Sequence, residues 1–555
     1  MNIADLGYPV QHVKISLGAL FPAIPCELYV DVALCLKIPH VEEDGRVCLD
    51  EVCQAVDFDE PVAAVVRALK RFQSELLERS SNEGWAQEQL QAERLSYWAR
   101  FCDQKQKEPR GRPRPSATLV NMESVVDWAE GRIAAYIPHG TKHRRFDVQV
   151  VTLGSLDPVN LAQRHGWSSG TLVKGRAAFA RLPDDLEWTP STWPTDFAHL
   201  DALVAAATYG QQSVAKWLMR TGWIDTSDGA EERLASCKIP DGSMPLLVVL
   251  CLGMELYGYQ ISPSTVSLVT APHAAPVKLL RIDPTWALIR DHAVTPFQQR
   301  QHKCVLLLGC GSLGSPIADI LGRSGVGGID IVDSQLLEPA NVSRHILGLS
   351  VIRQSKAKVV AARLSKDIPG IVANGFHDDA LRWMSKNCQP GKYDLILDCT
   401  AESTVRIFLS HLRSELFGDV PIVHAWVEPF CAAAHVVAST LSEPWPTNDP
   451  VRSHVNAADY SNADVRVKLP ACSDGFHPYG SADILQAAGF TGERVIEVLD
   501  RVLDDSRVWS FVRTQAFFDA LSLPITTNSI VPATGGIRDG VLTTRLLRDV
   551  LSSHE

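Results

Sequence analysis

The stretch Cys304–Gly314, CVLLLGCGSLG, decides the fold of the last part of this chain. A short apolar run of this kind, ended by a glycine, predicts a buried strand over 303–308. Gly309, Gly311 and Gly314 then lead into a helical pattern over 314–324. Glycines allow a tight turn and a close approach of the backbone, and the helix N-terminus directs free N–H groups at phosphate oxygens. The stretch therefore predicts a Rossmann-like nucleotide-binding turn.

Strands and helices alternate on the C-terminal side of this turn. Strands are expected at 329–332, 393–397, 420–426 and 432–439, and helices at 356–365 and 403–416. Such alternation is typical of an α/β domain with a parallel sheet. Asp333 ends the second strand, where a carboxylate accepts ribose hydroxyls in dinucleotide-binding proteins. These features alone would suit a nicotinamide or flavin dehydrogenase.

Polar residues beyond Asp333 favour a triphosphate instead. Asn341, Arg344 and Lys358 follow it closely, and Asp398 ends a later strand. Cations near a phosphate-binding turn offset the charge that builds on a leaving pyrophosphate. This set therefore disfavours the dehydrogenase interpretation.

The region 304–406 resembles the ThiF/MoeB superfamily, the adenylation domain of ubiquitin-activating enzymes. The matching residues are the three glycines, the ribose carboxylate, the Asn-x-x-Arg motif and a phosphate lysine: Gly309, Gly311, Gly314, Asp333, Asn341, Arg344 and Lys358. The resemblance implies ATP and Mg²⁺, adenylation of a protein C-terminus, and a homodimer. The family often takes an arginine from the partner subunit, for which Arg290 or Arg300 is a candidate.

One motif departs from the family pattern. The family usually reads Asp-Cys-Thr-Asp-Asn where this chain has Asp398, Cys399, Thr400, Ala401 and Glu402. The expected magnesium carboxylate is thus Ala401. Because Mg²⁺ needs only one or two carboxylates besides phosphate oxygens and water, Asp398 or Glu402 is expected to hold it.

Ubiquitin-type activation moves the acyl group from the adenylate to a cysteine. Cys472 is our candidate, because it lies in a polar loop ahead of a helix, where an exposed thiolate can attack. The alternative is an ordinary loop cysteine. Activation of a sulfur carrier in cofactor biosynthesis is a rival function, although those relatives usually carry Cys-x-x-Cys zinc motifs and this chain has none.

A second cysteine, Cys48, lies near the N-terminus. Ile38-Pro39-His40 precedes Gly45-Arg46-Val47-Cys48-Leu49 at the spacing that the His-Pro-Asn motif keeps from the cysteine of ubiquitin-conjugating enzymes. The resemblance implies a small α+β domain over 1–104, with Cys48 as acyl acceptor. It also implies that His40 donates a hydrogen bond to the oxyanion. The alternative is a small α/β domain in which Cys48 is merely buried.

An activating and a conjugating block in one chain resemble the fusion enzymes of bacterial CBASS antiphage operons. That resemblance implies a cyclic-nucleotide synthase as the activated protein and an amine-bearing protein as the target. We expect four segments: 1–104 conjugating, 105–115 a basic proline-rich linker, 116–295 a mixed α/β connecting domain, and 296–555 the adenylation domain with its cysteine segment.

Composition limits the remaining possibilities. The net charge of −11 disfavours general nucleic-acid binding, which depends on neutralising phosphates. The start of the chain lacks a signal-peptide pattern and the apolar runs are short, so we expect a cytoplasmic protein without membrane association. The 13 cysteines show no disulfide spacing. A non-catalytic nucleotide-binding scaffold remains the rival from another functional class.

Overall fold

A computed structural model describes residues 10, 12–48, 58–107, 115, 117–139, 147–221, 244–263, 272–289, 294–468 and 475–552. The chain divides into two compact units, Met1–Ile282 and Asp283–Glu555. The boundary lies before α8 (Pro284–Leu288) and α9 (Val294–Arg300), which therefore belong to the second unit. The finer division of the first unit into 1–104, a linker and a connecting domain stays a prediction.

The first part of unit 1 has a small core of its own. Strands β1 (Lys14–Ser16) and β2 (Glu27–Tyr29) pair antiparallel. Helix α1 (Pro61–Arg71) continues through a π-helical turn, η4 (Phe72–Leu77), and α2 (Glu78–Ser80). Phe72 and Leu76 are buried against Leu28, Val41 and their neighbours, whereas Val62 is exposed. The helix is then anchored mainly by its C-terminal turns.

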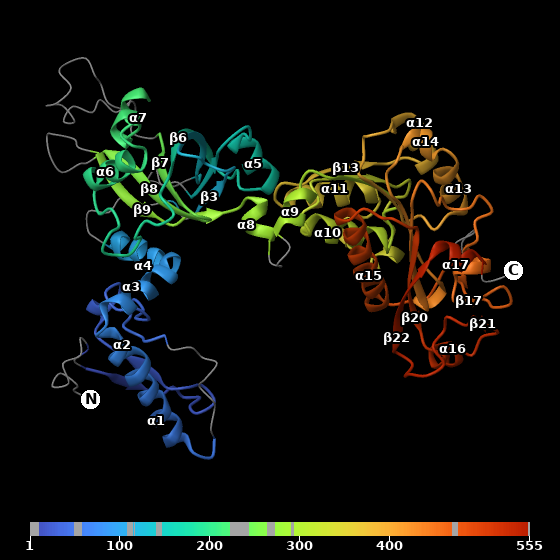
Figure 1. Cartoon of the computed structure of the whole chain (residues 1–555), viewed down its shortest axis with the longest axis horizontal. Coiled ribbons are helices and arrows are strands. Elements are labelled where there is room, and N and C mark those ends of the chain that lie inside the picture. Colours follow the sequence, from blue (N-terminus) through green and yellow to red (C-terminus); the bar gives the residue numbers. More distant parts are fainter. Residues whose placement is uncertain are drawn as a thin grey trace. The chain divides into compact units, whose positions relative to one another are not determined.

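An eight-stranded mixed sheet forms the rest of unit 1 (Figure 1). Its order is β10 (Leu280–Arg281), β3 (Ala117–Asn121), β5 (Val148–Thr152), β4 (Trp128–Ile137), β6 (Thr171–Arg181), β7 (Leu246–Leu252), β8 (Glu255–Pro263) and β9 (Pro272–Val277). Helix α5 (Pro158–His165) contacts β4 and β5. Two helices lie between β6 and β7, α6 (Phe197–Ala207) and α7 (Val214–Arg220). Ser213 caps α7 by accepting from the N–H of Lys216, which sets the start of this helix.

Aromatic side chains fill the core beneath this sheet. Helices α3 (Glu83–Ala92) and α4 (Arg94–Lys107) lead into it. Trp98 on α4 packs with Trp188, Trp193, Tyr257 and Tyr259. Trp98, Trp188 and Trp193 are thus core residues, and α4 belongs to this core.

Unit 2 contains a second eight-stranded sheet (Figure 1). Its order is β13 (Val372–Phe376), β12 (Gly328–Val332), β11 (Cys304–Leu308), β14 (Leu395–Asp398), β15 (Ile422–Val427), β16 (Ala433–Ser439), β20 (Arg507–Arg513) and β22 (Gly540–Leu546). The first five strands are parallel and the last three are antiparallel to their neighbours. The α/β fold predicted from the sequence is confirmed.

Helices cover both faces of the second sheet. Residues of α10 (Gly314–Arg323), α11 (Lys356–Asp367) and α15 (Ser481–Asp500) belong to the core on one face. Residues of α12 (Ala380–Asn387), α13 (Ser403–His411) and α14 (Arg413–Leu416) belong to the core on the other. Helices α16 (Gln515–Leu521) and α17 (Leu547–Ser552) flank β20 and β22.

The strand order fixes where a ligand can bind. From β11 the chain moves to β12 and β13 on one side, then returns to β14 on the other. The connections therefore leave the carboxyl ends of β11 and β14 in opposite directions. In open α/β sheets, a crevice forms at such a switch point.

None of the helices in the described part of the chain combines the length and apolarity that crossing a bilayer requires.

Candidate nucleotide site

The glycine turn lies at the switch point, and its three glycines differ in what they require. Gly309 has a φ of +84°, and a Cβ there would lie 2.9 Å from the backbone of Cys399 and Thr400. A Cβ on Gly314 would lie 2.1 Å from the carbonyl oxygen of Gly309. A Cβ on Gly311 would meet no atom within 4 Å. Gly309 and Gly314 are thus needed by the fold, whereas Gly311 borders open space.

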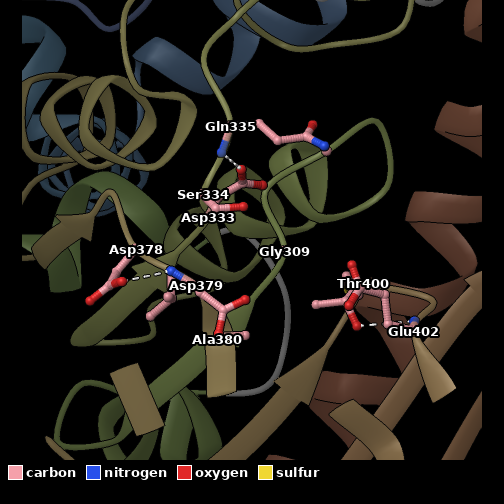
Figure 2. Close-up of a pocket in the computed structure, with 12 residues that line it drawn as sticks. Gly309, Asp333, Ser334, Gln335, Asp378, Asp379, Ala380, Thr400 and Glu402 are labelled. Carbon is pink, nitrogen blue, oxygen red and sulfur yellow. Dashed lines mark hydrogen bonds between the residues drawn. The ribbon is translucent and has the colours of Figure 1, made fainter. Parts of the chain in front are cut away.

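Two pockets meet at Gly311. The first, which we call the acidic pocket, has a volume of about 150 Å³. It is lined by Gly309, Gly311, Val332, Asp333, Ser334, Gln335, Asp378, Asp379, Ala380, Cys399, Thr400 and Glu402. Figure 2 shows Asp333, Asp378 and Asp379 on one side of the glycine turn, and Thr400 and Glu402 on the other.

Asp333 holds the turn as well as lining the pocket. One carboxylate oxygen accepts from the N–H of Cys310 at 2.7 Å, and the other from the N–H of Gln335 at 2.7 Å. The predicted ribose carboxylate is therefore fixed in place at the end of β12. Asp378 and Asp379, which we did not predict, follow β13 at the same sheet edge.

The second pocket, which we call the basic pocket, has a volume of about 220 Å³. Its lining includes Arg344 and Lys356, and the full set is Gly311, Ser312, Gln335, Asn341, Arg344, His345, Lys356 and Tyr479. Gly311 and Gln335 line both pockets. One elongated ligand can therefore lie along the turn, with its anionic part beside the two cations.

The pocket lysine is Lys356 and not Lys358. Ser355 caps α11 by accepting from the N–H of Lys358, so the helix begins at Lys356. Residues two apart on a helix differ in direction by about 200°. Lys358 is exposed and outside both pocket linings, while Lys356 is buried with its Nζ 2.7 Å from Oε1 of Gln335. Burial lowers the pKa of Lys356, which the nearby Asp333 opposes.

Asn341 and His345 shape the wall of the basic pocket. Oδ1 of Asn341 accepts from the N–H of Glu338 at 3.0 Å, which fixes the amide. Nδ1 of His345 accepts from the N–H of Leu347, so its Nε2 donates to the carbonyl oxygen of Cys310 at 2.8 Å. Burial lowers the pKa of His345, which favours this neutral form.

Asp398 lies below the pockets and does not line either of them. It is buried, and one oxygen accepts from the N–H and hydroxyl of Thr400 at 3.0 and 2.6 Å. The other oxygen is 2.9 Å from Nδ1 of His424 on β15. Both oxygens are thus engaged within the protein, which corrects the expectation that Asp398 faces the ligand. The carboxylate of this motif that lines the acidic pocket is Glu402.

No group of three or more His, Cys, Asp or Glu side chains arranged to hold a metal ion occurs among the described residues. A site with a single protein carboxylate would not form such a group, so Glu402 remains compatible with a phosphate-bound Mg²⁺.

Of the two cysteines predicted to carry the acyl group, the structure describes Cys48 but not Cys472. Cys472 lies in 469–474, outside the described residues. Cys48 is exposed in unit 1, and its N–H donates to the carbonyl oxygen of His40 at 2.8 Å. The Nδ1 of His40 is 3.7 Å from Oε1 of Glu93. The structure therefore brings Cys48 and His40 together across a short loop. Although the residue is exposed, partial desolvation of its thiol and the carboxylates of Glu42 and Glu93 raise the pKa of Cys48.

Part of unit 2 is similar to known proteins. Residues 288–463 match the model of the ThiF family. The chain is 25% identical over 227 residues to the "ATP-dependent ubiquitin transferase-like protein Cap2" of Pseudomonas aeruginosa, which covers 37% of this chain and 40% of that protein. It is 37% identical over 105 residues to the Cap2 protein of Enterobacter hormaechei, covering 19% and 17%.

Two further likenesses are more limited. The chain is 31% identical over 112 residues to the "Adenylyltransferase and sulfurtransferase MOCS3" of Xenopus laevis, covering 19% of this chain and 24% of that protein. The matches thus span less than half the length of these curated relatives. Escherichia coli MccB, solved with AMPCPP and MccA, aligns with 38% of this chain and 62% of its own at 15% identity. The TM-score of this alignment is 0.28.

The glycine turn, the Asn341 to Arg344 motif and the family model agree on the same region: residues 288–463 of this chain match the ThiF family.

Proposed function

We propose that unit 2 binds ATP and adenylates the C-terminal carboxyl group of a protein. The observation that carries this proposal is the pair of pockets joined at Gly311, one acidic and one basic. Carboxylates of the acidic pocket suit the hydroxyl and amino groups of a nucleoside. Arg344 and Lys356 suit the phosphates, because cations stabilise charge that develops as pyrophosphate leaves.

The chemistry follows from this placement. A carboxylate oxygen of the substrate attacks the α-phosphorus of ATP, and the bond to the β-phosphate oxygen breaks to release pyrophosphate. Mg²⁺, held by Glu402 and phosphate oxygens, would add positive charge at this position. Asp398 acts only by holding Thr400 and the turn that carries Glu402.

The later steps use the two cysteines. The Cys472 sulfur attacks the acyl carbon and AMP leaves; the Cys48 sulfur then attacks the thioester and frees Cys472. An amine of the target attacks the second thioester, forms an amide and releases Cys48. His40 is proposed to donate to the oxyanion of this last step. The likeness to proteins named as ATP-dependent ubiquitin transferase-like supports a transfer step after adenylation. From the resemblance of the sequence to CBASS fusion enzymes we also propose a homodimer and a role in antiphage defence, with a cyclic-nucleotide synthase as the activated protein.

ATP–pyrophosphate exchange tests the first step. The full chain, given a candidate substrate with a free C-terminus, should incorporate labelled pyrophosphate into ATP. Exchange should stop when the last residue of the substrate is removed. Exchange that is absent with the intact substrate, under conditions where ATP binds, would favour the non-catalytic scaffold.

Gly311 allows the pocket to be blocked without disturbing the fold. Gly311→Ala should keep the melting temperature within about 2 °C, since its Cβ meets no atom within 4 Å. It should weaken ATP binding about tenfold, because the methyl group occupies the path of the phosphates. Gly309→Ala should lower stability by about 1–3 kcal/mol, because its φ is +84° and backbone atoms lie 2.9 Å away. Scanning calorimetry measures the melting temperature of both variants, and titration calorimetry measures their affinity for ATP. An equal loss of stability in the two variants would contradict the claim that Gly311, unlike Gly309, borders open space.

The raised pKa of Cys48 predicts how its reactivity depends on pH. A raised pKa keeps the thiol protonated at neutral pH, so alkylation at pH 7 should be slower than that of free cysteine. The rate should rise about tenfold per pH unit up to pH 9. Glu42→Gln should speed alkylation, since the Glu42 charge raises the pKa of Cys48. Glu130→Gln is the control, because Glu130 pairs with Arg220 and neither charge acts on Cys48. Mass spectrometry of the Cys48 peptide measures the rate. A plateau below pH 8 would oppose this account.

A further inference from the structure

Two short paired strands, which we call the hairpin base, lie next to the basic pocket. Strands β18 (Val467–Lys468) and β19 (Gly475–Phe476) pair antiparallel, with Val467 opposite Phe476. The ring of His477 adds a hydrogen bond at 3.1 Å to the carbonyl oxygen of Val465. Residues 469–474, which include Cys472, connect the two strands and lie outside the described residues. The described residues therefore show how the ends of the Cys472 segment are held.

Arg344 attaches this hairpin base to the pocket. Its guanidinium lies 4.7 Å from the ring centre of Tyr479 and 5.3 Å from that of Phe476. One guanidinium N–H donates to the carbonyl oxygen of His477 at 2.9 Å. A cation between two aromatic rings is held by their negative faces, so the direction of Arg344 depends on this segment.

Tyr479 also reaches the glycine turn. Its hydroxyl lies 2.8 Å from Oγ of Ser312, and both residues line the basic pocket. Tyr479 thus contacts two parts of the phosphate side at once, through its ring and through its hydroxyl. No step of the proposed reaction uses this residue.

We propose, on the basis of the proposed function, that Tyr479 is a positioning residue that couples ATP binding to the hairpin carrying Cys472. A guanidinium has five N–H donors, so a phosphate can bind Arg344 while His477 keeps its bond. ATP then holds Arg344, and Arg344 holds the hairpin base. Because coupling of two binding events is reciprocal, the hairpin base held by Arg344 and Tyr479 also strengthens ATP binding.

Substitutions at Tyr479 separate this role from a purely structural one. Tyr479→Ala should raise the Kd for ATP about tenfold, and Tyr479→Phe about threefold, since the ring contact remains in the second variant. Tyr393→Phe is the matched control. It removes a buried tyrosine hydroxyl bond to Asp330 at the opposite, amino end of β14. Its Kd should equal that of the wild-type chain, measured by calorimetry on the full protein.

Tryptic cleavage after Arg466 and Lys468 reports on the hairpin itself. ATP should slow this cleavage in the wild-type chain and in Tyr393→Phe, and should leave it unchanged in Tyr479→Ala. Should Tyr479→Ala not fold, Ser312→Ala and Tyr479→Phe replace it; the double variant should be no weaker in ATP binding than either single variant.

The outcomes are distinguishable. If the wild-type chain does not bind ATP, both the proposed function and this inference are refuted. ATP binding of wild-type strength in Tyr479→Ala, or ATP protection that persists in it, would overturn the inference alone.

Discussion

Lys356→Met should lower kcat/KM for ATP–pyrophosphate exchange by about 100- to 1,000-fold, the usual effect of removing one group that stabilises developing charge. The amine of Lys356 lies in the basic pocket beside Gln335 and faces the proposed phosphate position. Methionine keeps most of the side-chain volume, so the loss would report the charge. The KM for ATP and kcat should both be measured.

Lys358→Met is the matched control for this prediction. Lys358 is exposed and outside the pocket lining, so its removal should change kcat/KM less than about threefold. The reverse ranking of the two variants would show that the ligand lies on the other side of α11 and would refute the placement of the phosphates.

Removing the two cysteines one at a time should stop the proposed relay at two different points. With the activated protein and ATP present, Cys472→Ala should form no thiol-sensitive adduct, while pyrophosphate exchange continues. Cys48→Ala should accumulate the adduct on Cys472 and form no amide product. The loss of the adduct in Cys472→Ala and the loss of the amide product in Cys48→Ala should both be complete, because no other group replaces the nucleophile. Gels run with and without reducing agent measure the adducts.

Cys388→Ala serves as the control in this experiment, since burial raises the pKa of the Cys388 thiol to about 11 and it should form no adduct. A sulfur-carrier adenylyltransferase would keep its full activity in Cys48→Ala. Persistence of both adducts in both variants would mean that other thiols carry the acyl group.

The sequence predicted the parts of the site that depend on local pattern. The glycine turn, Asp333 at the end of its strand, and Arg344 all lie at the pockets as their spacing indicated. The glycine turn and Asp333 follow from β11, the turn, α10 and β12 in succession, and Arg344 lies in the loop after β12. Local geometry alone is enough to place them.

Contacts between separate strands were not predictable in this way. Asp398 ends its strand as expected, but its partner His424 lies on the neighbouring strand β15, and the pairing withdraws the carboxylate from the pocket. Asp378 and Asp379 were missed because they follow β13, an edge strand whose partly exposed residues show no buried apolar run. The helix start expected at residue 356 agrees with α11. Which lysine of its first turn faces the pocket depends on how α11 packs against β12 and β13, and this packing places Lys356 rather than Lys358 in the pocket lining.

A crystal structure of the full chain with a non-hydrolysable ATP analogue would test the central claim most directly. The account predicts the triphosphate along Gly311, with its phosphates beside Arg344 and Lys356 and its ribose at Asp333. A structure in which the analogue is absent from both pockets, or in which NAD occupies them with its pyrophosphate on the turn, would contradict it.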